Sequence, residues 1–309
     1  MVIPNASATQ AGAYSVVATN NIGSTASAAA NLSVSPTPNF GHLINLSIRT
    51  SLTATDPSFT LGTVIGGAAG TKPLLVRAVG PSLAQFGITR AIPAAKLDLF
   101  AGSAVIASND GWGGSAALSS AFASVGAFAF TSATSRDSAI FNPGMPARDY
   151  TLNVSASGNV SGEVLAELYD AAPLAAFNAS MPRLVNVSVR KTISTGETLT
   201  VGFVIAGDTA RTVLIRAIGP GLAAFGVPGT MADPQLALFG GETKIAENDD
   251  WGGDAQLANL GSGVGAFKID DARSKDAMLV LTLAPGSYTA QVNATSSGGQ
   301  ALVEVYEVP

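Results

Sequence analysis

The sequence predicts an all-β chain in which two homologous antiparallel β-sandwich domains follow a shorter pair of strands. From Leu43 to the C-terminus the chain is one sequence written twice: Val76–Gly87 returns as Ile215–Gly226, and Asn109–Gly114 returns as Asn248–Gly253, both at an offset of 139 residues. This period indicates a duplicated domain, because solenoid repeats have periods of about 20–50 residues. Short runs of Val, Ile, Leu, Thr and Phe also recur about every 8 to 15 residues between turn residues, as in antiparallel sandwiches. Functional residues of the domain are therefore expected in both copies.

The composition excludes several classes of partner. Charged residues make up 12% of the 309 residues, against about 25% in ordinary soluble proteins. The surface is therefore expected to carry mostly small and neutral side chains. The net charge is −5 and no Lys/Arg cluster occurs, which excludes nucleic acid and anionic membranes as main partners. The apolar runs are too short for membrane insertion. The absence of cysteine excludes disulfides, thiol chemistry and zinc-thiolate sites.

The N-terminal segment, residues 1–35, contains two alternating strands joined at a turn, within Gln10–Gly23 and Ala28–Val34. These strands resemble the last two strands of an immunoglobulin-like domain. The resemblance implies that Tyr14 is a corner tyrosine whose hydroxyl bonds back to the backbone, and that Val16 occupies the position of a core cysteine.

A complete sandwich of this kind needs about 100 residues, so the segment is partial. Either the chain is a fragment of a longer protein, or a neighbouring molecule supplies the missing strands by β-augmentation. In the second case Tyr14 and Val16 lie at an interface. Residues 36–40, which contain two prolines, then form a short linker.

The duplicated region is expected to form two jelly-roll-like sandwiches, at residues 41–172 and 183–309, joined by a linker at 173–182. Each copy contains enough short apolar runs for two sheets. The Ala-rich stretch Ala116–Ala123 is the best helix candidate.

The second half of each copy runs from Leu-x-Leu-Phe through Asn-Asp-x-Trp to the final strand, and the chain stops just after a Val-Tyr strand at Val305–Pro309. This half resembles the pre-peptidase C-terminal type of β-sandwich. The duplicated unit also resembles the tandem C-terminal modules of large secreted bacterial proteins with immunoglobulin-like repeats. The resemblance implies an extracellular or cell-surface location and an accessory or structural role.

The Asn-Asp-x-Trp-Gly-Gly loops have two interpretations. Their oxygen-bearing side chains could hold calcium, a hard cation that takes six to eight oxygens. The candidate ligands are Asn109, Asp110, Asp137, Asn248, Asp249 and Asp276. Alternatively, each loop is an Asx-turn whose tryptophan closes one end of the sandwich. No cofactor is required in either case.

Two further pairs of side chains recur in both copies. Arg77 and Arg216 lie inside apolar strands, and Glu167 and Glu304 lie inside the closing strands, so we expect a tyrosine-sheltered structural ion pair in each copy. Trp112 and Trp251 could instead present aromatic platforms to a polysaccharide.

The comparison of the copies argues against an enzyme. The only histidine, His42, corresponds to Arg183, and Glu163 corresponds to Gln300. Neither copy therefore holds a nucleophile, a base and an orienting group at matched positions. We predict a non-enzymatic structural protein that self-associates into a homo-oligomer or polymer, as a subunit of a surface filament, stalk or adhesive assembly built through β-edges. The alternative is a carbohydrate-binding accessory module of a larger secreted enzyme.

Overall fold

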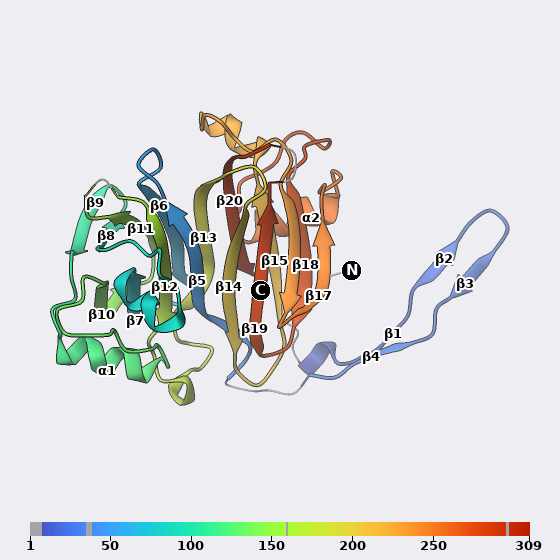
Figure 1. Cartoon of the computed structure of the whole chain (residues 1–309). Helices are drawn as coiled ribbons and strands as arrows, with labels where there is room; N and C mark the ends of the chain where they lie inside the picture. The colour runs from blue at the N-terminus through green and yellow to red at the C-terminus, as the bar shows by residue number, and fades with distance from the viewer. Residues whose placement is uncertain (1–7, 35–38, 159, 295–296) are drawn as a thin grey trace. The chain divides into compact units, whose positions relative to one another are not determined.

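The computed structural model describes residues 8–34, 39–158, 160–294 and 297–309. It divides the chain into two compact units, one of Met1–Pro38 with Pro309 and one of Asn39–Val308 (Figure 1). The fold is all-β, and its large sheets are antiparallel, as the sequence predicts.

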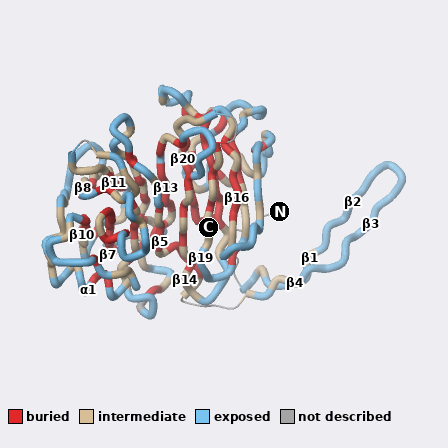
Figure 2. The backbone as a smooth tube through the Cα atoms, in the orientation of Figure 1, coloured by how far each residue is buried: buried red, intermediate tan, exposed pale blue. Residues whose placement is uncertain are grey.

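The N-terminal unit is a hairpin that pairs with itself. A short 3₁₀ helix (η1, Ala8–Gln10) precedes its strands, and β1 pairs with β4 while β2 pairs with β3. The bounds are Gly12–Tyr14 for β1, Val17–Thr19 for β2, Ser24–Ala26 for β3 and Ala30–Leu32 for β4. The side chain of Asn20 accepts the N–H groups of Ile22 and Gly23, which closes the predicted turn. The hairpin is exposed along its length (Figure 2).

Among the described residues, the duplicated region contains eight strands in each copy, in the same order. The first copy holds β5 (His42–Leu52), β6 (Ser58–Gly66), β7 (Thr71–Val79), β8 (Ala95–Ala101), β9 (Ala104–Asn109), β10 (Ser138–Pro146), β11 (Asp149–Ala156) and β12 (Gly162–Asp170). The second copy holds β13 (Arg183–Ile193), β14 (Thr198–Ala206), β15 (Arg211–Ile218), β16 (Gln235–Gly240), β17 (Thr243–Asn248), β18 (Ala277–Leu283), β19 (Gly286–Asn293) and β20 (Gly299–Glu307).

The helices of the duplicated region are short. The 3₁₀ helix η2 (Pro81–Phe86) recurs as η4 (Pro220–Phe225), the α-helix α1 (Ala116–Ser124) recurs as α2 (Ala255–Gly263), and the 3₁₀ helix η3 (Leu174–Ala176) lies between the copies. Helix α1 confirms the helix predicted at Ala116–Ala123. No helix among the described residues has the length and apolar character needed to cross a membrane.

Within each copy the strands form two four-stranded sheets with jelly-roll order. In the first copy these are β10-β7-β12-β5 and β9-β8-β11-β6, and the second copy repeats them as β18-β15-β20-β13 and β17-β16-β19-β14. In β6, strict alternation buries one face of the strand: the buried residues are Phe59, Leu61, Thr63 and Ile65. This alternation is what the sequence pattern predicts.

The two copies share their sheets across a junction that we call the seam. Strand β5 of the first copy pairs with β14 of the second, and β13 of the second pairs with β6 of the first. Two continuous sheets result, with the orders β10-β7-β12-β5-β14-β19-β16-β17 and β18-β15-β20-β13-β6-β11-β8-β9. The starts of β5 and β13 meet where Leu43 pairs with Leu184.

The core follows this shared arrangement. One large cluster of buried residues draws on both copies, and each copy adds a smaller cluster beneath its helix. Residues 41–172 and 183–309, which the sequence presents as two domains, lie together, apart from the last residue, in the single compact unit Asn39–Val308. Residues 173–182, expected as a linker, contain η3.

Candidate functional site: matched polar clusters and sheet edges

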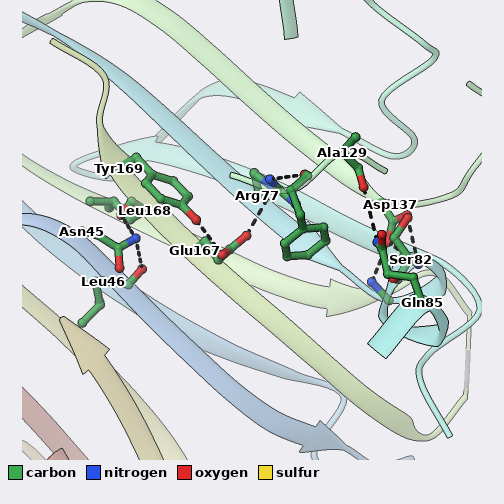
Figure 3. A network of polar contacts seen from close by, with 12 residues as sticks. Asn45, Leu46, Arg77, Ser82, Gln85, Ala129, Asp137, Glu167, Leu168 and Tyr169 are labelled. Atoms are coloured by element: carbon green, nitrogen blue, oxygen red, sulfur yellow. Dashed lines mark hydrogen bonds and ion pairs between the residues drawn. The ribbon is translucent and has the colours of Figure 1, made fainter. Parts of the chain in front are cut away.

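The ion pair expected in each copy is present. Arg77 on β7 lies directly opposite Glu167 on β12, with 3.2 Å between Nε and Oε2 (Figure 3). The hydroxyl of Tyr169 donates to the other carboxylate oxygen at 2.6 Å, and Arg77 donates to the Phe128 carbonyl at 2.8 Å. The guanidinium also lies over the rings of Phe122, Phe128 and Phe130, 4.3–4.5 Å from their centroids.

The second copy repeats the ion pair and its two hydrogen bonds, while its guanidinium lies over one ring among the described residues, that of Phe267. Arg216 lies 3.0 Å from Glu304, Tyr306 donates to that carboxylate at 2.7 Å, and Arg216 donates to the carbonyl of Phe267 at 2.8 Å. Burial raises the pKa of both carboxyls, while the facing arginine and tyrosine lower it. Because Arg77 has no exposed surface and Arg216 is 1% exposed, these pairs do not face solvent and hold the strands together.

Asp137 and Asp276 are buried caps of the Gly-Pro loops. The carboxylate of Asp137 accepts the N–H groups of Gly80 at 2.7 Å and Ser82 at 3.2 Å, together with the hydroxyls of Ser82 and Ser135. Asp276 accepts equivalent bonds from Gly219 at 2.8 Å, Gly221 at 3.1 Å and Ser274 at 2.6 Å. Each carboxylate therefore fixes the start of a 3₁₀ helix, η2 or η4.

The Asn-Asp loops make local contacts. Asn109 accepts from Ala139 N at 3.0 Å, and Asn248 accepts from Met278 N at 2.8 Å. Each asparagine also donates to a carbonyl two residues further on, to Gly111 O and Asp250 O. The loops are thus turns that are bonded to the following strands.

The acidic side chains of these loops pair with basic side chains of the protein. Asp110 pairs with Arg136 at 2.9 Å, and in the second copy Lys275 pairs at 2.7 Å with Asp250 rather than with Asp249. Among the residues that the structure describes, no three His, Cys, Asp or Glu side chains are grouped to hold a metal ion. The six proposed calcium ligands are therefore divided between a buried cap and a surface turn in each copy.

The two tryptophans close the smaller core clusters. Trp251 is 6% exposed and donates through its indole N–H to Asp271 O at 3.3 Å. Trp112 is partly exposed, donates to Ser132 O at 3.0 Å, and packs beside the rings of Phe122 and Phe130. A side chain buried like Trp251 has no open ring face, so the geometry favours packing over a ligand platform.

A further set of buried charges lies where β5 and β13 begin, and sequence reasoning missed it. Lys72 and Asp170 pair at 2.6 Å and are 2% and 3% exposed. At the matched positions of the second copy Arg211 pairs with Glu307 at 3.1 Å, and Arg183 reaches the same carboxylate at 2.6 Å. Asp170 and Glu307 directly follow the matched tyrosines. An acidic residue therefore stands at the same position in both copies, and a systematic comparison of the copies could have identified it.

His42 lies beside this cluster. Its ring stacks on Phe177 with 3.6 Å between centroids, and its Nδ1 is 2.8 Å from Phe40 O. Burial lowers the pKa of His42, although Glu307 and Asp170 act in the opposite direction. The carboxylate of Glu307 also accepts Leu43 N at 2.8 Å, so the cluster fixes the crossing point of the copies.

A small polar pocket of about 200 Å³ lies at the other ends of β5 and β13. Its charged groups are engaged within the protein: Arg49 lies 3.4 Å from Glu163, Lys191 pairs with Asp56, and Glu197 accepts from Ser194 N at 3.2 Å. Because these charged groups already have partners within the protein, the pocket has no evident chemistry.

In the part of the chain that the structure describes, the sheets end in four strands, β9, β10, β17 and β18, each of which pairs with one neighbour. Residues Val105 and Ile106 on β9 are 53% and 46% exposed. In the hairpin, Val16 is 72% exposed, and Tyr14 donates to Gln10 O at 2.7 Å, a bond of the kind expected of a corner tyrosine. Val16 therefore packs into no core among the described residues.

Comparison with known proteins does not assign the chain to a family. No family model and no curated protein matches it. Solved structures resemble it only distantly. They include PNGF-II, with 10% identity, a TM-score of 0.24, and coverage of 88% of this chain and 57% of that one. The coconut allergen cocosin has 6% identity and a TM-score of 0.17, with coverage of 85% and 77%, and vicilin from Corylus avellana (hazelnut) has 7% and 0.16, with 85% and 74%.

Proposed function

We propose that this chain is a non-enzymatic structural protein that self-associates through β-edges, as a subunit of a bacterial extracellular or cell-surface filament, stalk or adhesive assembly. The observation that carries this proposal is a set of exposed strands without protective charge. Unpaired edges present N–H and C=O groups to other chains, and soluble proteins usually guard them with charged residues, proline or bulges.

The N-terminal hairpin is the clearest case. No Asp, Glu, Lys or Arg occurs before Arg49, so nothing in the hairpin repels a second molecule. Its strands are three residues long, and Val16, Val17 and Ile22 are 72%, 60% and 91% exposed. An isolated two-stranded hairpin is marginally stable in water, so association with further strands would stabilise it.

The buried clusters support a structural role for the rest of the chain. The polar side chains that recur in both copies are engaged in ion pairs and caps within the protein, as described for Arg77, Asp137 and Lys72. Sheets that continue across the seam give a stiff body of the kind that a fibre or stalk requires.

Light scattering coupled to size exclusion tests the proposal, with negative-stain imaging of the same fractions. We compare the full chain with a shortened chain that starts at Asn39, because Asn39–Val308 forms a compact unit with its own core. We expect the full chain to form oligomers or filaments that grow with concentration. A full chain that stays monomeric at high concentration and binds no cell-surface material would contradict the proposal.

A further inference from the structure

The four end strands of the two sheets are not protected equally. Strand β10 carries Pro143 and Pro146, which lack an N–H to donate, and its register with β7 shifts between Asn142 and Met145. Strand β17 carries Lys244 and Glu247. These two strands end the same sheet, so both ends of that sheet carry recognised protection against further pairing.

The other sheet ends in β9 and β18, which lack these features. Strand β9 holds no charge and exposes Val105 and Ile106. At the positions of Lys244 and Glu247 it has Val105 and Ser108, so the copies differ in the protective residues themselves. A register shift occurs beside both β9 and β17 and does not distinguish them.

Strand β18 is equally open. It contains neither a charged residue nor a proline, and Thr282 is exposed. Met278 donates its N–H to Asn248, outside the ladder with β15. Because N–H directions alternate along a strand, Val280 and Thr282 also direct their N–H groups to the outer edge.

The directions of the two open strands are complementary. Every neighbouring pair in the order β18-β15-β20-β13-β6-β11-β8-β9 is antiparallel, so the first and eighth strands run in opposite directions. A second copy placed beyond β9 in the same orientation would bring its β18 alongside as an antiparallel neighbour. Head-to-tail contacts of this kind are heterologous, and they extend into open filaments when the rotation between copies does not close a ring.

We propose that β9 of one copy pairs with β18 of the next copy, so that this sheet continues from molecule to molecule. The inference rests on the proposed self-association and names a surface, separate from the N-terminal hairpin, that takes part in it. The occupant is a second copy because the chain itself carries two unprotected edges of opposite direction at opposite ends of one sheet. The other sheet does not continue, since its ends carry proline and charge.

Disulfide trapping tests this pairing in the full chain. The protein has no cysteine, so disulfides can form only between the introduced thiols. We mix two differently tagged variants, Ile106→Cys on β9 and Thr282→Cys on β18, and oxidise them at a concentration at which scattering shows oligomers. We expect disulfides that join the two variants to exceed those within either variant.

The outcomes separate this inference from the proposed function. Disulfides only between two copies of Ile106→Cys would indicate a closed two-fold dimer through β9 and overturn the head-to-tail pairing. Oligomers without disulfides would overturn the β9–β18 contact while self-association stands. Absence of oligomers altogether would overturn both.

Edge variants give an independent readout. Val105→Lys introduces into β9 the residue type found at the same position of the protected strand β17. An unpaired lysine in the proposed β9–β18 contact should raise the protein concentration needed for half-assembly at least about tenfold. Val105→Thr keeps a neutral β-branched side chain and should assemble as the parent does. Lys244→Val changes the edge outside the proposed contact and should leave assembly unchanged, whereas equal effects of Val105→Lys and Val105→Thr would contradict the pairing.

Discussion

Arg77 and Glu167 face each other across two neighbouring strands, and Arg216 and Glu304 do the same in the second copy, at 3.2 and 3.0 Å. In both copies a tyrosine donates to the carboxylate and a backbone carbonyl accepts from the arginine. Two sequences that differ at many positions retain the ion pair and both of these hydrogen bonds. The pair is therefore part of the framework of the module, which joins β7 to β12 and β15 to β20.

Removing one partner should be costly. Glu167→Gln leaves the guanidinium of Arg77 buried without a counter-charge, and breaking a buried pair in this way costs about 3–5 kcal/mol. We expect a loss of this size in the free energy of urea unfolding, and a similar loss for Glu304→Gln. Replacing both partners with apolar residues should cost less than either single change, because no buried charge remains.

The chain provides a matched control for this measurement. Glu163 pairs with Arg49 at 3.4 Å, but both side chains are partly exposed, at 32% and 60%, and the second copy has Gln300 at the corresponding position. Glu163→Gln should therefore change the free energy of unfolding by less than about 1 kcal/mol. If Glu163→Gln were as destabilising as Glu167→Gln, burial would not be the cause of the effect.

Asp137 should contribute to stability through its capping bonds. Asp137→Ala removes an acceptor that serves Gly80 N, Ser82 N and two hydroxyls, and leaves buried donors unsatisfied. We expect a loss of about 2–4 kcal/mol in the free energy of unfolding, with a similar loss for Asp276→Ala. Asp110→Ala, at the exposed Arg136 pair, is the control and should have little effect. Equal effects at Asp110 and Asp137 would contradict the capping role.

The sequence predicts some of these features and not others, for identifiable reasons. Alternation identifies the buried face of β6 and the inward positions of Arg77 and Glu167, because it depends only on the strand itself. It cannot identify the neighbour of an edge strand, so the pairing of β5 with β14 across the seam was not predicted. The Lys72 and Asp170 pair was missed because a charge near a strand end has the pattern of a solvated residue.

His42 should make stability depend on pH in a narrow window. Burial lowers its folded-state pKa below the unfolded value of 6.5, so between the two values the unfolded chain binds more protons than the folded chain. Its contribution is complete above pH 6.5 and is lost progressively as the pH falls toward the folded pKa. Glu307 and Asp170 raise the pKa of the ring and reduce the effect, whereas Lys72 lowers it and adds to the effect.

Urea midpoints at several pH values between 5 and 8 measure this dependence. His42→Gln removes the titration, so the difference in midpoint between parent and variant should change with pH below 6.5 and stay constant above it. Because His42 is the only histidine, its ring protons in an NMR spectrum give the folded pKa directly. A folded pKa at or above 6.5 would contradict the prediction.

The tryptophans should differ in their access to a neutral quencher such as acrylamide. Trp112→Phe leaves Trp251, which is 6% exposed, as the only indole, whereas Trp251→Phe leaves the partly exposed Trp112. We expect weaker quenching in the Trp112→Phe protein, because collision requires an open ring face. Neither variant should change its quenching when polysaccharide is added, since the indole N–H groups already donate to Ser132 O and Asp271 O and the rings pack on the core. Protection of either indole by a glycan would instead favour a carbohydrate-binding role for these loops.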